Sequence, residues 1–232
     1  MQIFYTPDIA VNAELPEEEA GHCIRVLRLT EGDEILLTDG KGFFYKAAIS
    51  RAHPKHCEVS LLESWNQPAL WNCRIHIAVA PTKNMDRMEW FAEKATEIGI
   101  DAITCLHCRF SERKDVKISR LEKILVSAMK QSQKATLPQL EGMTDFKTFV
   151  CRPFTGRKFI AHCEEGEKTL LKQTYHIGED ALILIGPEGD FSSEEIKLAL
   201  ENGFEPISLG ESRLRTETAA LVACHTIHVL NE

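Results

Sequence analysis

The chain has 232 residues, a length that suits one large domain or two domains of moderate size. Its residues are 44% apolar and 27% charged, which is typical of a protein with a buried core and excludes a globally disordered chain. The net charge of −8 argues against a general nucleic-acid binder, because binding to phosphates requires an excess of lysine and arginine.

The first residues of the chain show no basic segment followed by an apolar one, so no signal peptide is expected. No apolar run approaches the roughly 18 to 20 residues that span a bilayer. The eight cysteines are scattered without the spacing of a disulfide framework, which fits a reducing compartment. These features predict a cytoplasmic protein.

Residues 1–68 have the pattern of a small β domain. Two β-rich runs flank the turn Asp39-Gly-Lys-Gly42 and predict a β-hairpin, and a third run with alternating polarity follows at residues 56–62. A short helix with Pro16 near its start is expected before the hairpin. Short strands joined by tight turns indicate a small barrel, and residues 64–68 are expected to form a linker.

From residue 73 onward, strands and helices alternate, which predicts a parallel sheet flanked by helices. Four helices are expected: residues 85–98, ended by Gly99; residues 117–134; one opened by a capping box at Ser192; and a last one capped by Thr216. Strands are expected over residues 74–80, 103–108, 158–163, 181–185 and 206–209.

A single C-x-x-C motif, Cys105-Leu-His-Cys108, lies in one of these strand-like runs. A structural zinc site would need a second ligand pair at motif spacing, and the sequence offers none. We interpret both cysteines as buried strand residues and expect no metal.

Basic residues gather between residues 109 and 134, where eight of them accompany three acidic residues. From charge alone, a solvated helix face and a surface that binds RNA are equally good interpretations.

Two loops follow predicted strands at the edge where parallel α/β sheets bind ligands. The first is Gly186-Pro-Glu-Gly-Asp190, and the second is Gly210-Glu-Ser-Arg-Leu-Arg-Thr216. Neither fits the dinucleotide fingerprint or the P-loop, which argues against a nucleotide-binding oxidoreductase. Their glycines favour close approach of the backbone to a ligand, although a tight strand-to-helix connection explains the first loop equally well.

Together the two loops closely resemble those of the RsmE family, the 16S ribosomal RNA uridine-N3 methyltransferases of the SPOUT (α/β-knot) superfamily. The resemblance extends over nearly the whole chain, including His22-Cys-Ile-Arg-Val-Leu-Arg28 near the N-terminus and Glu93-Lys-Ala-Thr-Glu-Ile-Gly99 in the middle. The sequence departs from the family pattern at Asp190, where a third glycine is frequent.

The resemblance implies an α/β fold in two domains. Residues 1–68 are expected to form a PUA-like β-barrel that binds RNA, and residues 73–232 a SPOUT methyltransferase domain containing a deep trefoil knot. Such proteins are dimers with the catalytic cleft at the subunit interface, so a homodimer is expected. The implied partner is ribosomal RNA or the small ribosomal subunit.

The resemblance also implies S-adenosyl-L-methionine as the cofactor, held in a bent shape mainly by backbone groups. The expected cofactor-binding residues come from the two loops, from the strands that precede them and from the end of the strand at residues 159–162. They are His162, Ile185, Gly186, Pro187, Glu188, Gly189, Leu209, Gly210, Leu214 and Thr216.

Methylation of uridine N3 requires that its proton leaves and that negative charge on the uracil oxygens is stabilised. Arg215 is the first candidate for this stabilisation, and Arg213 is the next. Glu217 is a candidate to orient Arg215 or to accept the proton through water, although a carboxylate that only interacts with the helix dipole is an equally good interpretation. Five basic residues are candidates for RNA contacts: Arg25, Arg28, Arg109, Arg113 and Lys114.

Two alternatives stay open. One is another SPOUT enzyme that methylates ribose 2′-oxygens, which the match at residues 22–28 argues against. The other is a non-catalytic RNA-binding factor of ribosome assembly, and a bare scaffold would have no need of the chemistry in either loop.

Overall fold

A computed structural model describes residues 2–232 of the chain. Its contacts divide these residues into two compact units. The first contains the described residues up to Ala69 together with Val126–Leu137, and the second contains Leu70–Leu125 and Pro138–Glu232. Helix α3 (Ile118–Gln131) therefore contributes residues to both units.

The first unit is built on a four-stranded sheet in the order β1-β2-β3-β4. Strand β1 is parallel to β2, and the other neighbours are antiparallel. The strands are β1 (Ile3–Tyr5), β2 (Glu34–Thr38), β3 (Phe43–Arg51) and β4 (Glu58–Asn66).

Strands β2 and β3 form the predicted hairpin. Oδ1 of Asp39 accepts hydrogen bonds from the backbone N–H groups of Lys41 at 2.7 Å and Phe43 at 3.1 Å. Gly40 and Gly42 have φ angles of 72° and 107°, which favour glycine because it has no Cβ. The hairpin prediction is confirmed, and the turn chemistry explains it.

The prediction of a linker at residues 64–68 is wrong for residues 64–66, which belong to strand β4. Strand β4 continues to Asn66, because β3 offers pairing partners as far as Phe43. The Phe44 and Trp65 rings pack across these strands with centroids 5.9 Å apart, an aromatic pair that stabilises the register.

The helix predicted near Pro16 is α1 (Glu17–Gly21), which continues into one turn of π-helix, η1 (His22–Val26). Pro16 precedes the first helical residue, where its missing N–H costs nothing. These turns cover a core drawn from the sheet and the preceding segment. Its largest fully buried members are Phe4, Ile9, Leu15, Ile35, Leu37 and Ile49.

The second unit is built on a parallel sheet of seven strands in the order β7-β6-β5-β10-β8-β11-β9. The strands are β5 (Ile75–Val79), β6 (Ala102–His107), β7 (Gln139–Asp145), β8 (Arg157–Ala161), β9 (Thr169–Leu170), β10 (Ala181–Ile185) and β11 (Glu205–Ser208). Besides α3, the helices of this unit are α2 (Met85–Ile98), α4 (Phe146–Val150), α5 (Leu171–Thr174), α6 (Ser193–Glu201) and α7 (Thr216–Asn231).

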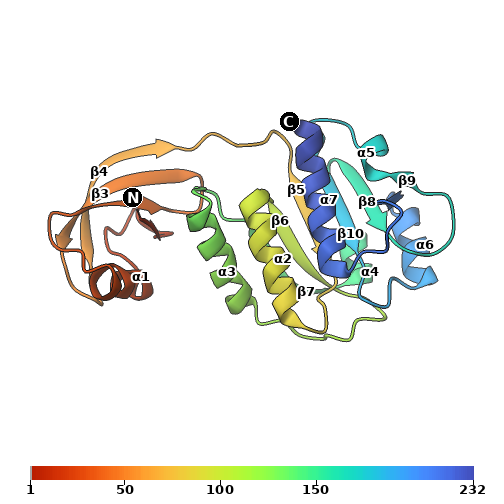
Figure 1. Cartoon of the computed structure of the whole chain (residues 1–232), viewed down its shortest axis with the longest axis horizontal. Helices are drawn as coiled ribbons and strands as arrows, with labels where there is room; N and C mark the ends of the chain where they lie inside the picture. The colour runs from red at the N-terminus through yellow and green to blue at the C-terminus, as the bar shows by residue number, and fades with distance from the viewer. Residues whose placement is uncertain (1) are drawn as a thin grey trace. The chain divides into compact units, whose positions relative to one another are not determined.

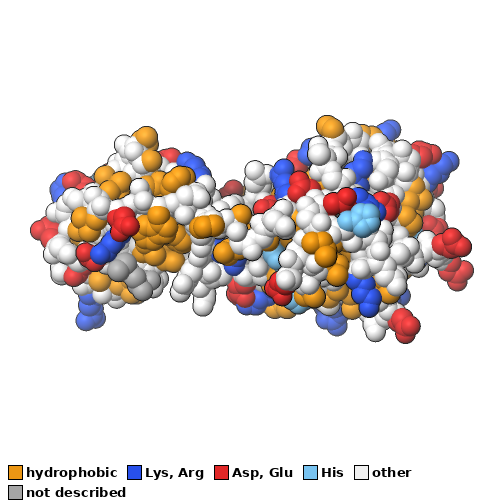
Figure 2. Space-filling view, turned by 90° about the horizontal axis from the view of Figure 1, so that it is seen from above, with side chains coloured by type: hydrophobic (Ala, Val, Ile, Leu, Met, Phe, Trp, Pro, Cys, Tyr) orange, Lys and Arg blue, Asp and Glu red, His pale blue; other side chains and the backbone are white. Residues whose placement is uncertain are grey.

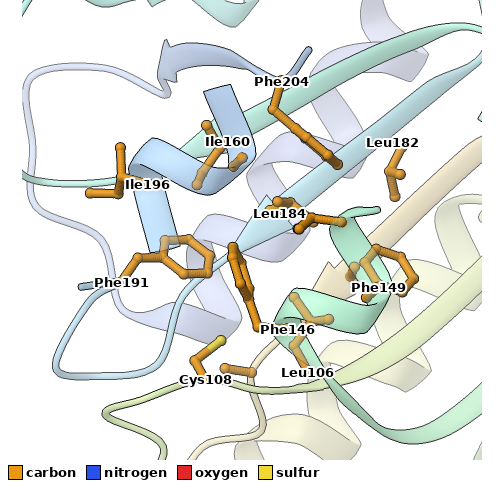
Figure 3. Packing of buried hydrophobic residues seen from close by; sticks show 14 residues of the cluster. Leu106, Cys108, Phe146, Phe149, Ile160, Leu182, Leu184, Phe191, Ile196 and Phe204 are labelled. Atoms are coloured by element: carbon orange, nitrogen blue, oxygen red, sulfur yellow. The ribbon is translucent and has the colours of Figure 1, made fainter. Parts of the chain in front are cut away.

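Helices cover both faces of this sheet. Helices α2 and α7 lie side by side, and α7 contacts β5 and β10 (Figure 1). On the other face, Leu182 and Leu184 of β10 join a core with α4 and α6, in which the Phe146 and Phe191 rings pack 5.4 Å apart between centroids (Figure 3). All five residues of β10 are buried, as expected for a central strand covered on both faces.

The predicted helix ends are confirmed for α2 and α6. Gly99 ends α2 with a φ of 135°, and Ser192 forms a capping box with Glu195 at the start of α6. Strand β7 and the short elements α4, β9 and α5 were not predicted. Strand β7 carries a central glycine and no clear alternation, and the others are too short for a periodic pattern.

The two cysteines of the C-x-x-C motif are buried in and just after β6. Burial raises the pKa of the Cys105 thiol to about 12 and raises that of Cys108 as well. Both thiols are therefore protonated and act as small apolar groups. Among residues 2–232, no helix is long and apolar enough to cross a membrane.

Candidate functional site

A cavity of about 310 Å³ opens in the second unit at the carboxyl ends of β8 and β10. Parallel strands end together at this edge, so the segments that follow them meet around one space. The residues that line the cavity are Arg87, Ala161, Cys163, Ile185, Gly186, Pro187, Glu188, Asp190, Arg213, Leu214, Arg215, Thr216 and Ala219.

The two glycine-bearing loops meet at this cavity through Thr216. Its Oγ1 donates a hydrogen bond to the carbonyl oxygen of Gly186 at 3.1 Å, and both groups are buried. The prediction that Thr216 caps the last helix is wrong, since the N-cap position of α7 is Arg215 and no side chain caps it. The hydroxyl instead joins the two loops.

Asp190 ends the first loop with a φ of 67°, the left-handed conformation that glycine favours. Its backbone N–H donates to the carbonyl of Pro187 at 2.9 Å and closes the turn. Its Oδ2 accepts from the backbone N–H of Cys163 at 2.7 Å. The aspartate therefore keeps the tight turn and also ties the loop to the segment after β8.

Glu188 connects the first loop to the segment that follows β5. Its Oε1 accepts from the backbone N–H of Lys83 at 2.9 Å. The guanidinium of Arg113 donates to the carbonyls of Thr82 at 3.2 Å and Lys83 at 2.5 Å, so this arginine also holds the segment.

The cavity wall carries three arginines, two of which the sequence had singled out. Arg213 and Arg215 are exposed, whereas Arg87 in the first turn of α2 is half-buried. Nε of Arg87 lies 3.8 Å from Oε1 of Glu217, a residue that is only 7% exposed. The ion-pair partner of Glu217 is thus Arg87, and none between Glu217 and Arg215 occurs among residues 2–232.

Six of the ten predicted cofactor residues line the cavity: Ile185, Gly186, Pro187, Glu188, Leu214 and Thr216. The other four, His162, Gly189, Leu209 and Gly210, lie next to residues or strands that form it but are not in its wall. A Cβ at Gly189 would approach Phe110, whereas a Cβ at Gly210 would meet open space.

His162 follows β8 directly, and its ring is half-buried. Burial, with a smaller contribution from Lys168, lowers the pKa of its imidazole. Its Nδ1 is buried without a hydrogen-bond partner. A neutral imidazole with a buried unpaired nitrogen is suited to contact a polar ligand.

The sequence pattern did not reveal Arg87, Cys163 and Ala219 as cavity residues. A signal for Arg87 was present, since its segment follows β5, the strand beside β10. The rule that ligands lie beyond the carboxyl ends of strands applies to that segment as well.

The predicted RNA contacts are distributed over both units. In the first unit, Arg25 and Arg28 are exposed, in and just after η1. In the second, Arg109 and Lys114 are exposed, whereas Arg113 is half-buried and bonded to backbone carbonyls. Acidic and basic side chains are interspersed on the face that Figure 2 shows, so RNA contacts there would be local.

Comparison with known proteins identifies the family. A model of the RNA methyltransferase domain matches residues 69–228. The chain belongs to this RNA methyltransferase family. A second model, the RNA methyltransferase PUA domain, matches residues 15–62.

Relatives of this RNA methyltransferase match along almost their whole length. The ribosomal RNA small subunit methyltransferase E of Rickettsia conorii is 29% identical, with 99% of this chain and 95% of the relative covered. A crystal structure of a probable rRNA-methyltransferase from Porphyromonas gingivalis is 47% identical, with a TM-score of 0.94 and coverage of 100% and 98%. A ribosomal RNA small subunit methyltransferase E from Neisseria gonorrhoeae, bound to S-adenosyl methionine, is 26% identical, with a TM-score of 0.86 and coverage of 99% and 98%.

Proposed function

We propose that this RNA methyltransferase transfers a methyl group from S-adenosyl-L-methionine to N3 of a uridine in the RNA of the small ribosomal subunit. The observation that carries the proposal is the cavity in which the two loops meet, with arginines in its wall. The names of the relatives support the RNA substrate, and the cofactor bound to the Neisseria protein supports the methyl donor.

The cavity residues fit such a cofactor. The volume of about 310 Å³ lies within the range of small-molecule sites. Leu214, Ile185 and Ala219 offer apolar surface, and the backbone of the first loop offers polar contacts. When bound, the sulfonium supplies an activated methyl group.

The chain's own residues position the base and stabilise charge. Arg215, at the start of α7, is the first candidate to donate hydrogen bonds to the uracil oxygens as negative charge develops on them, and Arg213 is the second. Neither side chain has a hydrogen bond or an ion pair among residues 2–232, so both are available for a substrate.

We propose a matching arrangement of domains and subunits. Residues 1–68 form a PUA-like barrel that binds RNA, residues 73–232 form the catalytic domain, and two copies form a homodimer in the cytoplasm. The C-terminal segment forms a deep trefoil knot. The contact of Thr216 with Gly186 supports the knot, because it places the second loop against the first.

A methylation assay tests the activity. Small ribosomal subunits reconstituted with unmodified RNA are incubated with the protein and S-adenosylmethionine, and the nucleosides are identified by mass spectrometry. We expect 3-methyluridine. A 2′-O-methylated nucleoside would instead indicate ribose chemistry, and no methylated product would favour an assembly factor.

Titration calorimetry with S-adenosylhomocysteine tests the site. An Ala219→Trp variant fills the cavity and should abolish binding. Val229→Trp is the matched control, because Val229 is 54% exposed on the same helix and lies outside the cavity wall. Unchanged binding by Ala219→Trp would place the cofactor elsewhere.

A further inference from the structure

Glu217 is a buried acidic residue directly behind the cavity residues Thr216 and Arg87, and its hydrogen bonding is incomplete. The residue is 7% exposed, and its Oε2 is buried without any hydrogen-bond partner. Removing a carboxylate oxygen from water without a donor costs about 1–3 kcal/mol or more. A residue that only had to start a helix would not need this burial, so the unpaired oxygen indicates a donor that arrives with a ligand.

Arg87 determines where that carboxylate lies. It stands in the first turn of α2, two residues after the first helical residue, and its side chain is 38% exposed. Arg87 lines the cavity, and its Nε lies 3.8 Å from Oε1 of Glu217. The arginine therefore contacts one oxygen of Glu217 and leaves the other oxygen for a different donor.

The imide edge of a uracil presents an N–H donor at N3, and Oε2 of Glu217 is an acceptor without a donor. Arg87 lies beside the other oxygen of the same carboxylate. We propose that Glu217 accepts the N3 proton directly and that Arg87 is the positioning residue that holds its carboxylate for this step. The inference rests on the proposed function.

The step balances in atoms and charge. The N3–H bond breaks and its proton passes to Oε2 of Glu217, while N3 forms a bond to the methyl carbon. The carbon–sulfur bond breaks, and its electron pair stays on sulfur. One positive sulfonium and one carboxylate become a neutral thioether and a carboxylic acid, which returns its proton to water after product release.

A double-mutant cycle tests the assignment, with kcat and KM measured on unmodified small ribosomal subunits. Glu217→Gln should lower kcat about 100-fold, the lower end of the range for general-base catalysis. Arg87→Met should lower kcat about tenfold with little change in KM, and Arg87→Lys should recover part of that loss. In the double variant, kcat should equal that of Glu217→Gln alone, because Arg87 acts through Glu217.

Arg152→Met is the matched control, since Arg152 forms an exposed ion pair with Glu141 outside the cavity wall. Its kcat should equal that of the unmodified protein. Binding of S-adenosylhomocysteine verifies that every variant keeps its fold and cofactor site.

Two results would overturn the inference. One is an Arg87→Met variant that changes KM alone, and the other is a double variant in which the two losses multiply. If the unmodified protein makes no 3-methyluridine, the proposed function itself fails. If it makes 3-methyluridine and Arg87→Met keeps full kcat, only the role of Arg87 fails.

Discussion

The two ends of the α2–α7 pair are built in opposite ways. At the end of α2, His228 of α7 is hydrogen-bonded to the Gly99 carbonyl at 2.6 Å, and the Trp71 ring packs edge-on against His228 with centroids 5.2 Å apart. At the start of α2, Arg87 and Glu217 face each other at 3.8 Å beside an open cavity. At the first end the side chains are closely packed and the polar groups are hydrogen-bonded. At the second end there is an open cavity and a carboxylate oxygen without a hydrogen-bond partner.

This difference indicates that the packed end stabilises the second unit and that the cavity end does not. Close packing with satisfied hydrogen bonds stabilises the fold. An incompletely paired buried carboxylate does not, and such groups concentrate at functional sites. Changes at the packed end should therefore affect stability, and changes at the cavity end should affect binding and catalysis.

The largest effect is expected for Gly99→Ala. A Cβ there would lie 2.7 Å from the Trp71 ring and 2.8 Å from the His228 ring, at a φ of 135° that alanine rarely adopts. Overpacking and backbone strain together should lower the free energy of unfolding by about 3 kcal/mol or more, measured by denaturant titration.

Gly203→Ala separates the two causes. Gly203 also has a positive φ, 80°, but its Cβ would meet only Lys158 at an ordinary 3.6 Å. This control substitution should lower the free energy of unfolding by about 1 kcal/mol. Equal losses in both variants would show that the packed end has more space than the structure indicates.

The next largest effect is expected in the pH dependence of stability, and its source is His76 in the sheet of the second unit. His76 is half-buried against the Phe149 ring, with its Nε2 hydrogen-bonded to Thr104 Oγ1 at 2.8 Å. Burial, helped by Arg74, lowers the pKa of His76 from 6.5 to about 4. The unfolded chain therefore binds the proton first, and stability present above pH 6.5 should fall by about 3 kcal/mol as the pH approaches 4.

His76→Gln measures this contribution by difference. The glutamine variant should lose less stability than the unmodified protein between pH 6.5 and 4, as measured by urea titration at several pH values. Parallel curves for the two proteins would show that the pKa of His76 is the same in the folded and the unfolded chain.

At the cavity end, Thr216→Val should have a moderate effect on both stability and binding. The change leaves the buried Gly186 carbonyl without its donor and should cost about 1–2 kcal/mol of stability. It also releases the contact between the loops, so affinity for S-adenosylhomocysteine should fall roughly tenfold. Thr226→Val, on the same helix outside the cavity wall, should leave affinity unchanged.

The smallest effect should have the opposite sign. Glu217→Leu removes a buried carboxylate with an unpaired oxygen and should raise the free energy of unfolding by about 1 kcal/mol while abolishing methylation. Glu194→Leu is the control, because Glu194 stands exposed in the first turn of α6. A clear loss of stability in Glu217→Leu would mean that this carboxylate supports the fold.

Local sequence patterns predicted most of the second unit. The bounds of α2 followed from its apolar face together with Gly99, and the capping box at Ser192 located the start of α6. Strand β10 was visible as a short apolar run. Strand β7 was not predicted, because its residues show no period of two. It is a strand because it pairs with β6.

The sequence by itself determined which segments are strands and helices and which loops carry glycine, because these depend on neighbours a few residues apart. Only the tertiary structure decided that Thr216 meets Gly186, that Asp190 ties its loop to Cys163, and that Arg87 faces Glu217. These pairs are separated by 27 to 130 positions, and strand order brings them together. No local pattern encodes that order, since it depends on how the whole sheet buries its apolar faces.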